Sequence, residues 1–153
     1  MKYDWELTEE EFGPFYSFIQ DKNVTDIDYN GKTLWIADLQ RGRYQADAVV
    51  REEFIERFTH RIANRVNKPF NRANNVLEAE TNELRISIVH ESAAVSGRSI
   101  CIRKSLPQVR QTVEGMLDSG YCTVEILSLL INCVKAKMNF AFCGEPGVGK
   151  TEC

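Results

Sequence analysis

The sequence predicts a mixed α/β protein, in which an α+β region with an antiparallel sheet and helices precedes the start of an α/β region. Three observations predict this class. Short runs of alternating apolar and polar residues indicate strands, and Asn30-Gly31 between two such runs is a strong tight-turn signal. Apolar residues at helical spacing indicate helices between the strands. Near the end of the sequence, a continuous apolar run precedes a glycine-rich loop, as at the start of many α/β units.

Capping and turn residues predict the first elements. Thr8 with Glu11 forms a capping-box pattern, so we expect a short helix that Gly13-Pro14 interrupts and that resumes through FYSFIQ. The segment VTDIDYNGKTLWIADLQRGRYQAD then predicts a meander of short strands, with a second, weaker turn signal at its Arg-Gly pair.

A longer helix is predicted between residues 50 and 66. The apolar residues that recur there at helical spacing are Phe54, Ile55, Phe58, Ile62 and Val66. Pro69 prevents this helix from continuing, because proline lacks the backbone N–H and clashes with the preceding turn.

Two later strands carry an arginine each on their polar side. In NVLEAETNELRISIVHE and in SICIRKS, apolar residues alternate with polar ones that include Arg85 and Arg103. Because side chains change face at each step along a strand, both arginines point away from the apolar face of their strands. If the two strands share one sheet over one core, both arginines lie on its other side. The plain alternative is that both are simply solvated strand arginines.

Two helices and a buried strand are predicted after residue 105. TVEGMLDSG and TVEILSLLINCVKAK read as helices, and Thr123 is a plausible N-cap of the second. MNFAFC is typical of a strand buried on both faces. We therefore divide the chain into an N-terminal α+β domain (1–105), a linker and helical segment (106–137) and the beginning of a second, α/β domain (138–153).

The glycine-rich loop matches the pattern G-x-x-x-x-G-K-[ST], in which backbone N–H groups surround phosphate oxygens. Lys150 is predicted to reach the β- and γ-phosphates, and the Thr151 hydroxyl to bind Mg²⁺. By average residue usage, the four fixed positions coincide in a chain this long with a chance of very roughly one per cent or less. The loop comprises Gly144, Glu145, Pro146, Gly147, Val148, Gly149, Lys150 and Thr151.

Composition excludes several classes of protein. The chain has 153 residues, 43% of them hydrophobic, which is enough for one full globular domain or two small ones. A net charge of −3 argues against direct nucleic-acid binding. Five widely spaced cysteines without a C-x-x-C pair indicate the reduced thiols of a cytosolic protein. No apolar stretch approaches the length that spans a bilayer, so we expect a soluble protein.

With these motifs in place, most of the chain resembles the secretion ATPases of the VirB11/CpaF (TadA) type, in the type II/type IV secretion superfamily. VTDIDYNG is similar to an early strand and turn of that family, and VREEFIERFTHRIANRVNKPFN to its regulatory-domain helix. ELRISIVHESAAVSGRSICIRKS is similar to the segment that ends in I-R-K, and LDSGYCTVEILSLLINCVKAKMNFAFCGEPGVGKT to the run that ends in the phosphate loop.

The resemblance implies an N-terminal PAS-like domain followed by the first strand and phosphate loop (Walker A) of a RecA-like motor domain. Members of the family are hexameric ATPases at the inner face of the cytoplasmic membrane, and they act with secretion or pilus apparatus proteins. The resemblance also implies ATP and Mg²⁺. Two basic residues that approach the γ-phosphate in the family fall on Arg85 and Arg103, so with Lys150 they are the predicted catalytic residues.

Some features depart from the family pattern and leave alternatives open. The loop reads GEPGVGKTE where the family has one closer to G-x-T-G-S-G-K-T-T, and a GEPGVGKT loop looks equally like that of AAA+ ATPases. The proline expected between the two strands of the I-R-K segment is absent. We expect a fragment of a larger ATPase that is inactive alone. The alternatives are a non-enzymatic docking or oligomerisation module and an AAA+ fragment.

Overall fold

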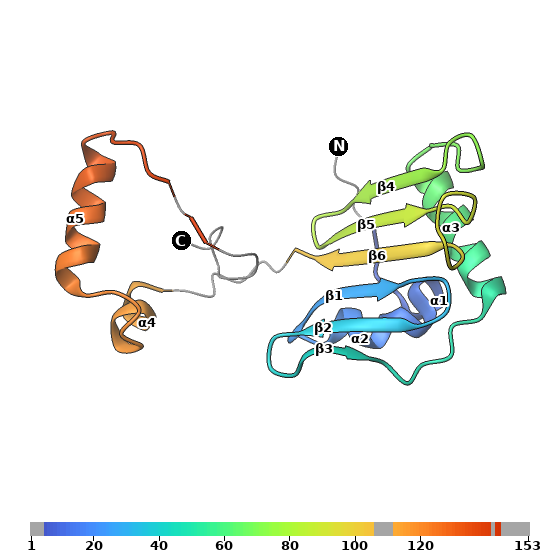
Figure 1. Ribbon diagram of the computed structural model, residues 1–153, viewed down its shortest axis with the longest axis horizontal. Coiled ribbons are helices and arrows are strands. Elements are labelled where there is room, and N and C mark those ends of the chain that lie inside the picture. Colours follow the sequence, from blue (N-terminus) through green and yellow to red (C-terminus); the bar gives the residue numbers. More distant parts are fainter. Residues whose placement is uncertain (1–4, 106–111, 142, 145–153) are drawn as a thin grey trace. The chain divides into compact units, whose positions relative to one another are not determined.

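The computed structural model describes residues 5–105, 112–141 and 143–144 (Figure 1). The chain divides into two compact units, Met1–Leu106 and Pro107–Cys153. The finer division into three parts at residues 105 and 137 stays a prediction.

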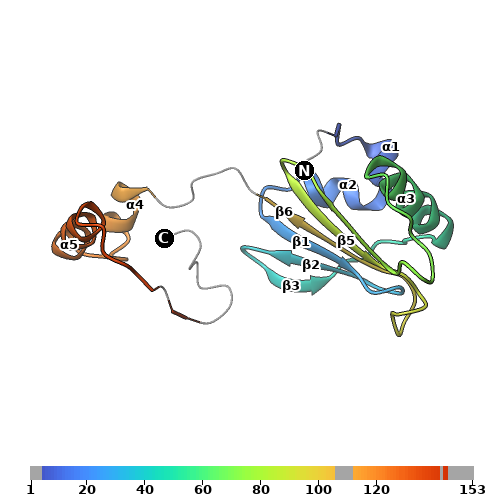
Figure 2. The same ribbon diagram turned by 90° about the horizontal axis from the view of Figure 1, so that it is seen from above.

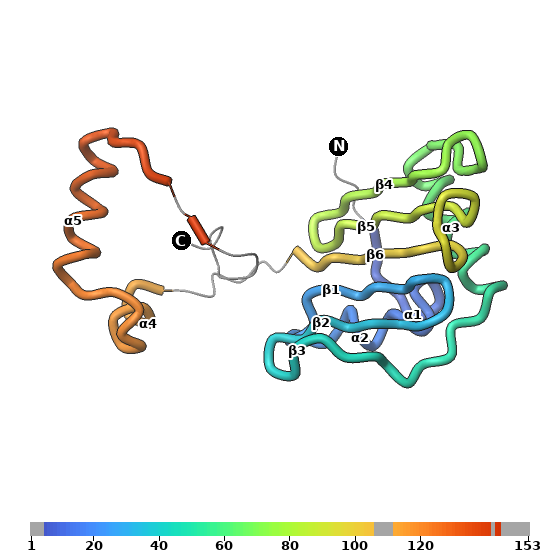
Figure 3. Tube along the Cα trace, viewed as in Figure 1, coloured from blue at the N-terminus to red at the C-terminus, as the bar shows by residue number. Residues whose placement is uncertain are grey.

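The first unit is built on a six-stranded sheet in the order β3-β2-β1-β6-β5-β4, and each neighbouring pair is antiparallel. In Figure 3 the early strand β1 and the late strand β6 lie side by side at its centre. The predicted α+β class with an antiparallel sheet is confirmed. The strands are β1 (Val24–Tyr29), β2 (Leu34–Asp38), β3 (Gly42–Gln45), β4 (Val76–Glu80), β5 (Leu84–Val89) and β6 (Ser99–Lys104).

Three short turns of helix precede the sheet, as the capping box predicts. They are α1 (Glu9–Phe12), the 3₁₀ turn η1 (Gly13–Phe15) and α2 (Tyr16–Gln20). The Thr8 side chain accepts a hydrogen bond from the Glu11 backbone N–H, which satisfies one of the donors left free at a helix start. Gly13 has a φ of +45° and Pro14 follows it, so the helical path changes direction there.

The predicted longer helix is α3 (Glu52–Arg65), which packs on the same face of the sheet as α1 and α2 (Figure 2). Its buried residues follow the helical period, and Phe58 is the centre of an aromatic cluster. The Phe58 ring meets those of Phe12 and Phe15 edge-on at 5.6 Å and stacks on Phe54 at 5.8 Å. Edge-to-face rings stabilise the core beyond the area they bury.

The sheet contributes alternate side chains to this core, as its sequence pattern predicts. In β5 and β6 the buried residues Ile86 and Ile102 lie directly opposite each other, and both are fully inaccessible to solvent. Branched side chains of this kind fit a pleated surface that is covered on one side. The other face of the sheet carries no helix of the first unit within residues 5–105.

Side chains fix both hairpin turns of the first meander. The Asn30 carboxamide oxygen accepts from the backbone N–H groups of Lys32 and Thr33, and Gly31 takes the left-handed conformation with φ +92°. At the β2–β3 turn the Asp38 carboxylate accepts from the Arg41 backbone and guanidinium, which lowers the pKa of Asp38 to about 2. At the outer strand β4, Lys68 Nζ donates to the backbone oxygen of Glu78 at 3.3 Å.

The second unit contains the two predicted helices, α4 (Val113–Asp118) and α5 (Val124–Lys135). The hydroxyls of Thr112 and Thr123 cap their first turns. None of the residues in these two helices is buried, and large apolar side chains on α5 face solvent. Among the described residues, no helix is both long enough and apolar enough to span a lipid bilayer.

The strand predicted for MNFAFC is not formed in residues 138–141. Met138 and Phe140 are 59% and 40% exposed instead of buried. The physical reason is that a strand buried on both faces needs neighbouring strands for its backbone hydrogen bonds. The described part of the second unit holds only helices, so this segment has no strand to pair with.

The aromatic cluster gives a direct test of the core. Replacing Phe58 by Ala removes a side chain that is 2% exposed and leaves a cavity among three other rings. We expect the free energy of unfolding of the first unit to fall by about 3–5 kcal/mol. Urea denaturation followed by tryptophan fluorescence measures it. Val95→Ala, at a fully exposed position, is the control with a change within about 0.5 kcal/mol. Equal midpoints for the two variants would contradict this account of the core.

Candidate functional site

The register of β5 against β6 places Arg85 directly opposite Arg103. Both lie on the face of the sheet that the helices leave open, because their neighbours Ile86 and Ile102 are buried on the other face. The geometric expectation from the alternating pattern is therefore confirmed. The two guanidinium side chains remain 62% and 66% exposed. A role in binding nucleotide stays a prediction at this point.

Each arginine has a carboxylate on its outer side. Arg85 Nη2 donates to Glu80 Oε1 at 3.2 Å, and Arg103 Nε donates to Asp26 Oδ1 at 2.7 Å. Glu80 is the cross-strand neighbour of Arg85, and Asp26 that of Arg103. These four side chains form one row across β4, β5, β6 and β1, which we name the charge row. Its charges run minus, plus, plus, minus.

Like charges directly opposite in a sheet destabilise it, so two adjacent arginines need compensation. The carboxylates of Asp26 and Glu80 provide this compensation, and Asp26 raises the pKa of Arg103 by its hydrogen bond and its charge. Sequence reasoning did not find these two partners. The alternation in VTDIDY marks Asp26 as outward-facing, but only the pairing of β1 with β6 reveals which arginine it meets.

A second ion pair lies next to the charge row on the same face. Arg43 Nη2 is 3.0 Å from Asp28 Oδ2, and its guanidinium also lies over the Trp35 ring. Asp28 is the cross-strand neighbour of Cys101. Burial, and then a hydrogen bond with Asp28, raise the pKa of the Cys101 thiol to about 12. This thiol therefore stays protonated at neutral pH and is a poor nucleophile.

Lys104, which follows Arg103, points to the opposite side of the sheet. Its ammonium donates to the backbone oxygen of Asp21 at 2.5 Å, and burial lowers its pKa. Of the two basic residues in the I-R-K segment, only Arg103 thus belongs to the open face.

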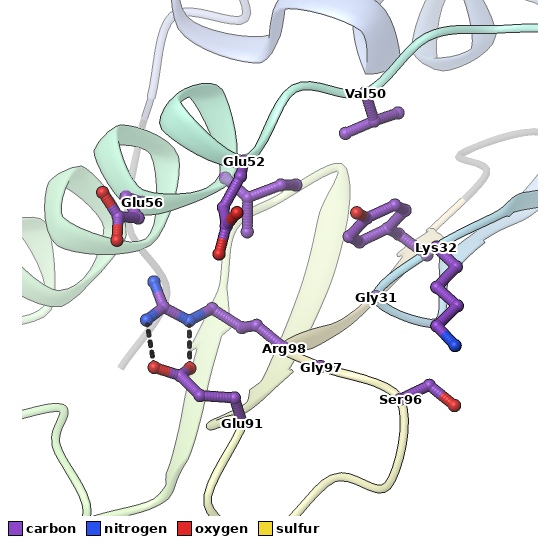
Figure 4. A pocket seen from close by; sticks show the side chains of 11 residues that line it. Gly31, Lys32, Val50, Glu52, Glu56, Glu91, Ser96, Gly97 and Arg98 are labelled. Carbon is purple, nitrogen blue, oxygen red and sulfur yellow. Dashed lines mark hydrogen bonds and ion pairs between the residues drawn. The ribbon is translucent and has the colours of Figure 1, made fainter.

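A separate pocket of about 480 Å³ lies where the start of α3 meets the β1–β2 turn and the β5–β6 loop (Figure 4). Gly31 and Gly97 touch there, and a Cβ on Gly31 would lie 2.6 Å from the backbone oxygen of Ser96. Arg98 makes two hydrogen bonds with Glu91, at 2.8 and 3.0 Å, and its guanidinium lies over the Phe70 ring. Figure 4 shows Glu52 projecting from α3 toward this pair, and Glu56 lies further along the same helix. No sequence motif predicted this pocket.

The other predicted site residues belong to the phosphate loop. Gly144 is exposed, whereas Glu145, Pro146, Gly147, Val148, Gly149, Lys150 and Thr151 lie outside the described residues. In the part of the chain that the structure describes, no group of three or more acidic, histidine or cysteine side chains is placed to hold a metal ion. The Mg²⁺ site predicted at Thr151 remains a prediction.

Comparison with solved structures finds the same fold in a secretion ATPase. The VirB11 ATPase of the Brucella suis type IV secretion system, solved in complex with sulphate, matches with a TM-score of 0.62 and 20% sequence identity. The match covers 94% of this chain and 50% of that one, so the chain spans about half the length of the VirB11 structure. The chain shares the fold of about half of a VirB11 ATPase. No protein-family model matches the sequence, and neither does any curated protein.

This likeness confirms the VirB11 resemblance at the level of the fold. The CpaF part of this resemblance and the PAS-like character of the first unit stay predictions. Within the shared fold, the charge row is the feature of the described residues that places two of the predicted site residues side by side.

The Arg98–Glu91 pair predicts a pH dependence of stability. Hydrogen bonds from Arg98 lower the pKa of the Glu91 carboxyl from 4.5 to about 2. A carboxyl with a lowered pKa in the folded state stabilises the fold above pH 4.5, and this contribution is lost as the pH falls toward 2. We expect Glu91→Gln to lower the melting temperature at pH 6, and the difference from wild type to shrink between pH 4.5 and 2.

Thermal unfolding followed by circular dichroism at a series of pH values measures this difference. The matched control is Glu56→Gln, which changes an exposed glutamate of the same pocket that makes no ion pair among the described residues. A constant difference between wild type and Glu91→Gln from pH 6 to pH 2 would show that Arg98 does not stabilise the ionised carboxyl.

Proposed function

We propose that this chain is the N-terminal part of an ATP-binding and ATP-hydrolysing motor that powers secretion, pilus assembly or conjugative transfer. The observation that carries the proposal is the pair Arg85–Arg103, side by side and exposed on the open face of a sheet with the VirB11-type fold. The phosphate-loop sequence at residues 144–151 supports it independently.

Each residue has a distinct part in this proposal. The backbone of residues 144–149 surrounds the phosphates, and the Lys150 ammonium neutralises the β- and γ-phosphate oxygens. The Thr151 hydroxyl is a hard oxygen donor of the type that Mg²⁺ prefers. When bound at Thr151, Mg²⁺ would supply positive charge that offsets the negative charge of the phosphates.

Arg85 and Arg103 act on the outer phosphate in this proposal. Guanidinium groups match phosphate oxygens with two parallel hydrogen bonds, and they stay charged at every relevant pH. Two of them on neighbouring strands present donors to one tetrahedral anion from two directions. The sulphate in the related VirB11 structure is an anion of the same shape. Contact with the γ-phosphate would make the position of the first unit depend on whether ATP or ADP is bound.

Partners and location follow from the same resemblance as proposals. We infer a homo-oligomer, with six subunits in the whole protein, that works with secretion or pilus apparatus proteins. It would act in the cytoplasm, peripherally bound at the inner face of the cytoplasmic membrane. The net charge of −3 supports the further proposal that it does not bind nucleic acid directly.

The motor proposal is tested in the protein that contains this chain, by phosphate release from ATP. Lys150→Ala is expected to abolish turnover, because the loop then lacks its main cation for the phosphates. Arg85→Ala and Arg103→Ala are expected to reduce kcat roughly tenfold or more, because arginines that contact the γ-phosphate stabilise its transfer. The control is Arg57→Ala, an exposed arginine on the helix-covered side of the sheet. Unchanged turnover in Lys150→Ala would end the proposal.

A second candidate function, a docking or oligomerisation module without enzymatic activity, has one observation in its favour. Apolar side chains of α5 are exposed, including Leu129 at 62% and Val134 at 64%, and exposed apolar patches mark interaction sites more often than free surface. This candidate predicts that the chain assembles without nucleotide and that Leu129→Asp reduces the assembly. Sedimentation equilibrium measures this. A monomer at all concentrations, with or without the substitution, would count against the module.

A further inference from the structure

We propose that Asp26 and Glu80 occupy the two arginines of the charge row in the ligand-free protein and are displaced when a polyphosphate binds there. The two carboxylates then set how tightly this face holds phosphate. The inference rests on the proposed function, because it takes Arg85 and Arg103 as the phosphate-binding pair. It goes beyond that function by assigning a role to two acidic residues.

The order of charges in the row is the first argument. The arginines are cross-strand neighbours of each other, and each carboxylate flanks them on the outside. The row is therefore neutral as a whole, and neither carboxylate lies between the guanidinium groups. An anion that bridges both arginines occupies the inner space and competes with Asp26 and Glu80 for the same N–H donors.

Exposure is the second argument. Both guanidinium groups are more than half exposed, and ion pairs at such positions are weak because water and salt screen them. A phosphate group with two negative charges interacts with both arginines at once. Its interaction energy with the pair is therefore larger than that of either carboxylate with its single arginine. The ion pairs are thus strong enough to hold the arginines in place and weak enough to exchange for a ligand.

The two carboxylates differ in strength. Asp26 is 22% exposed and lies 2.7 Å from Arg103, whereas Glu80 is 37% exposed and lies 3.2 Å from Arg85. A shorter bond in a less hydrated place competes better with an incoming anion. Asp26 is therefore the stronger competitor, and its removal has the larger effect.

The neighbouring pair Asp28–Arg43 supplies a matched control. Asp28 lies on the same strand and the same face as Asp26, two residues further along, and it bonds Arg43 instead of either arginine of the pair. Asp28→Asn therefore changes the net charge of the face by the same amount as Asp26→Asn. It leaves the competition for Arg85 and Arg103 intact.

The test measures binding of inorganic triphosphate to the 153-residue chain. Titration is followed by NMR of the arginine Nε–H groups at low salt, with Lys150→Ala in every protein so that the cation of the phosphate loop does not contribute and the loop backbone is the same throughout. We expect Asp26→Asn to bind about two- to fivefold more tightly and Glu80→Gln somewhat less than that, as the strength of exposed ion pairs suggests. Asp28→Asn is expected to change the dissociation constant less than 1.5-fold, roughly the effect of screened charge alone.

The outcomes separate the competition by the carboxylates from the phosphate role of the arginine pair. If Arg85→Ala and Arg103→Ala weaken binding while Asp26→Asn and Glu80→Gln leave it unchanged, the competition is overturned and the arginine pair keeps its role. If Asp28→Asn strengthens binding as much as Asp26→Asn, general charge explains the effect and the competition is again overturned. If neither arginine substitution weakens binding, the phosphate role of the pair fails as well. Glu80→Gln keeps the test decisive should Asp26→Asn disturb β1.

Discussion

The pairing of β1 with β6 is the contact on which the rest of the first unit depends. It joins the meander β1-β2-β3 to the meander β6-β5-β4, and it connects residues as far apart in sequence as Asp26 and Arg103. The same register buries Ile27 against Ile102. A shift of β1 by one residue would turn Ile27 to the open face while Ile102 stays buried, and it would separate Asp26 from Arg103, because side chains alternate along a strand. Burial on one face thus fixes the charge pattern on the other.

This coupling gives the open face a rigid base. The charged side chains project from paired strands whose undersides are packed on α1, α2 and α3. Groups held by a packed sheet lose little further conformational freedom when a ligand binds. The affinity of this face for a ligand therefore depends less on the entropy cost of ordering the protein than on the charges it presents. The remaining freedom is in the long arginine side chains themselves. The partners of those side chains, more than the backbone, therefore determine what the face can bind.

Local patterns predicted much of this arrangement. Alternation placed Arg85 and Arg103 on one face, and the capping box and the Asn30-Gly31 turn each predicted a local structure that formed. The partner of Arg103 was beyond prediction, because Asp26 meets it only through a strand pairing across most of the unit. Glu80 lies in the same hairpin as Arg85, five residues away, and no motif marked it. The strand predicted for the apolar run at residues 138–141 did not form, for a related reason. Its composition predicted burial, but a strand forms only where another strand pairs with it.

The lysine beside β4 has a consequence for how the protein behaves at high concentration. An outer strand presents unpaired backbone groups, to which a strand from another molecule can add. In β4 the carbonyl of Glu78 already accepts a hydrogen bond from the Lys68 ammonium. A strand approaching that part of the edge has to displace a hydrated charge before its own backbone can pair. Lys68 thereby opposes the addition of a second molecule at this edge of the sheet.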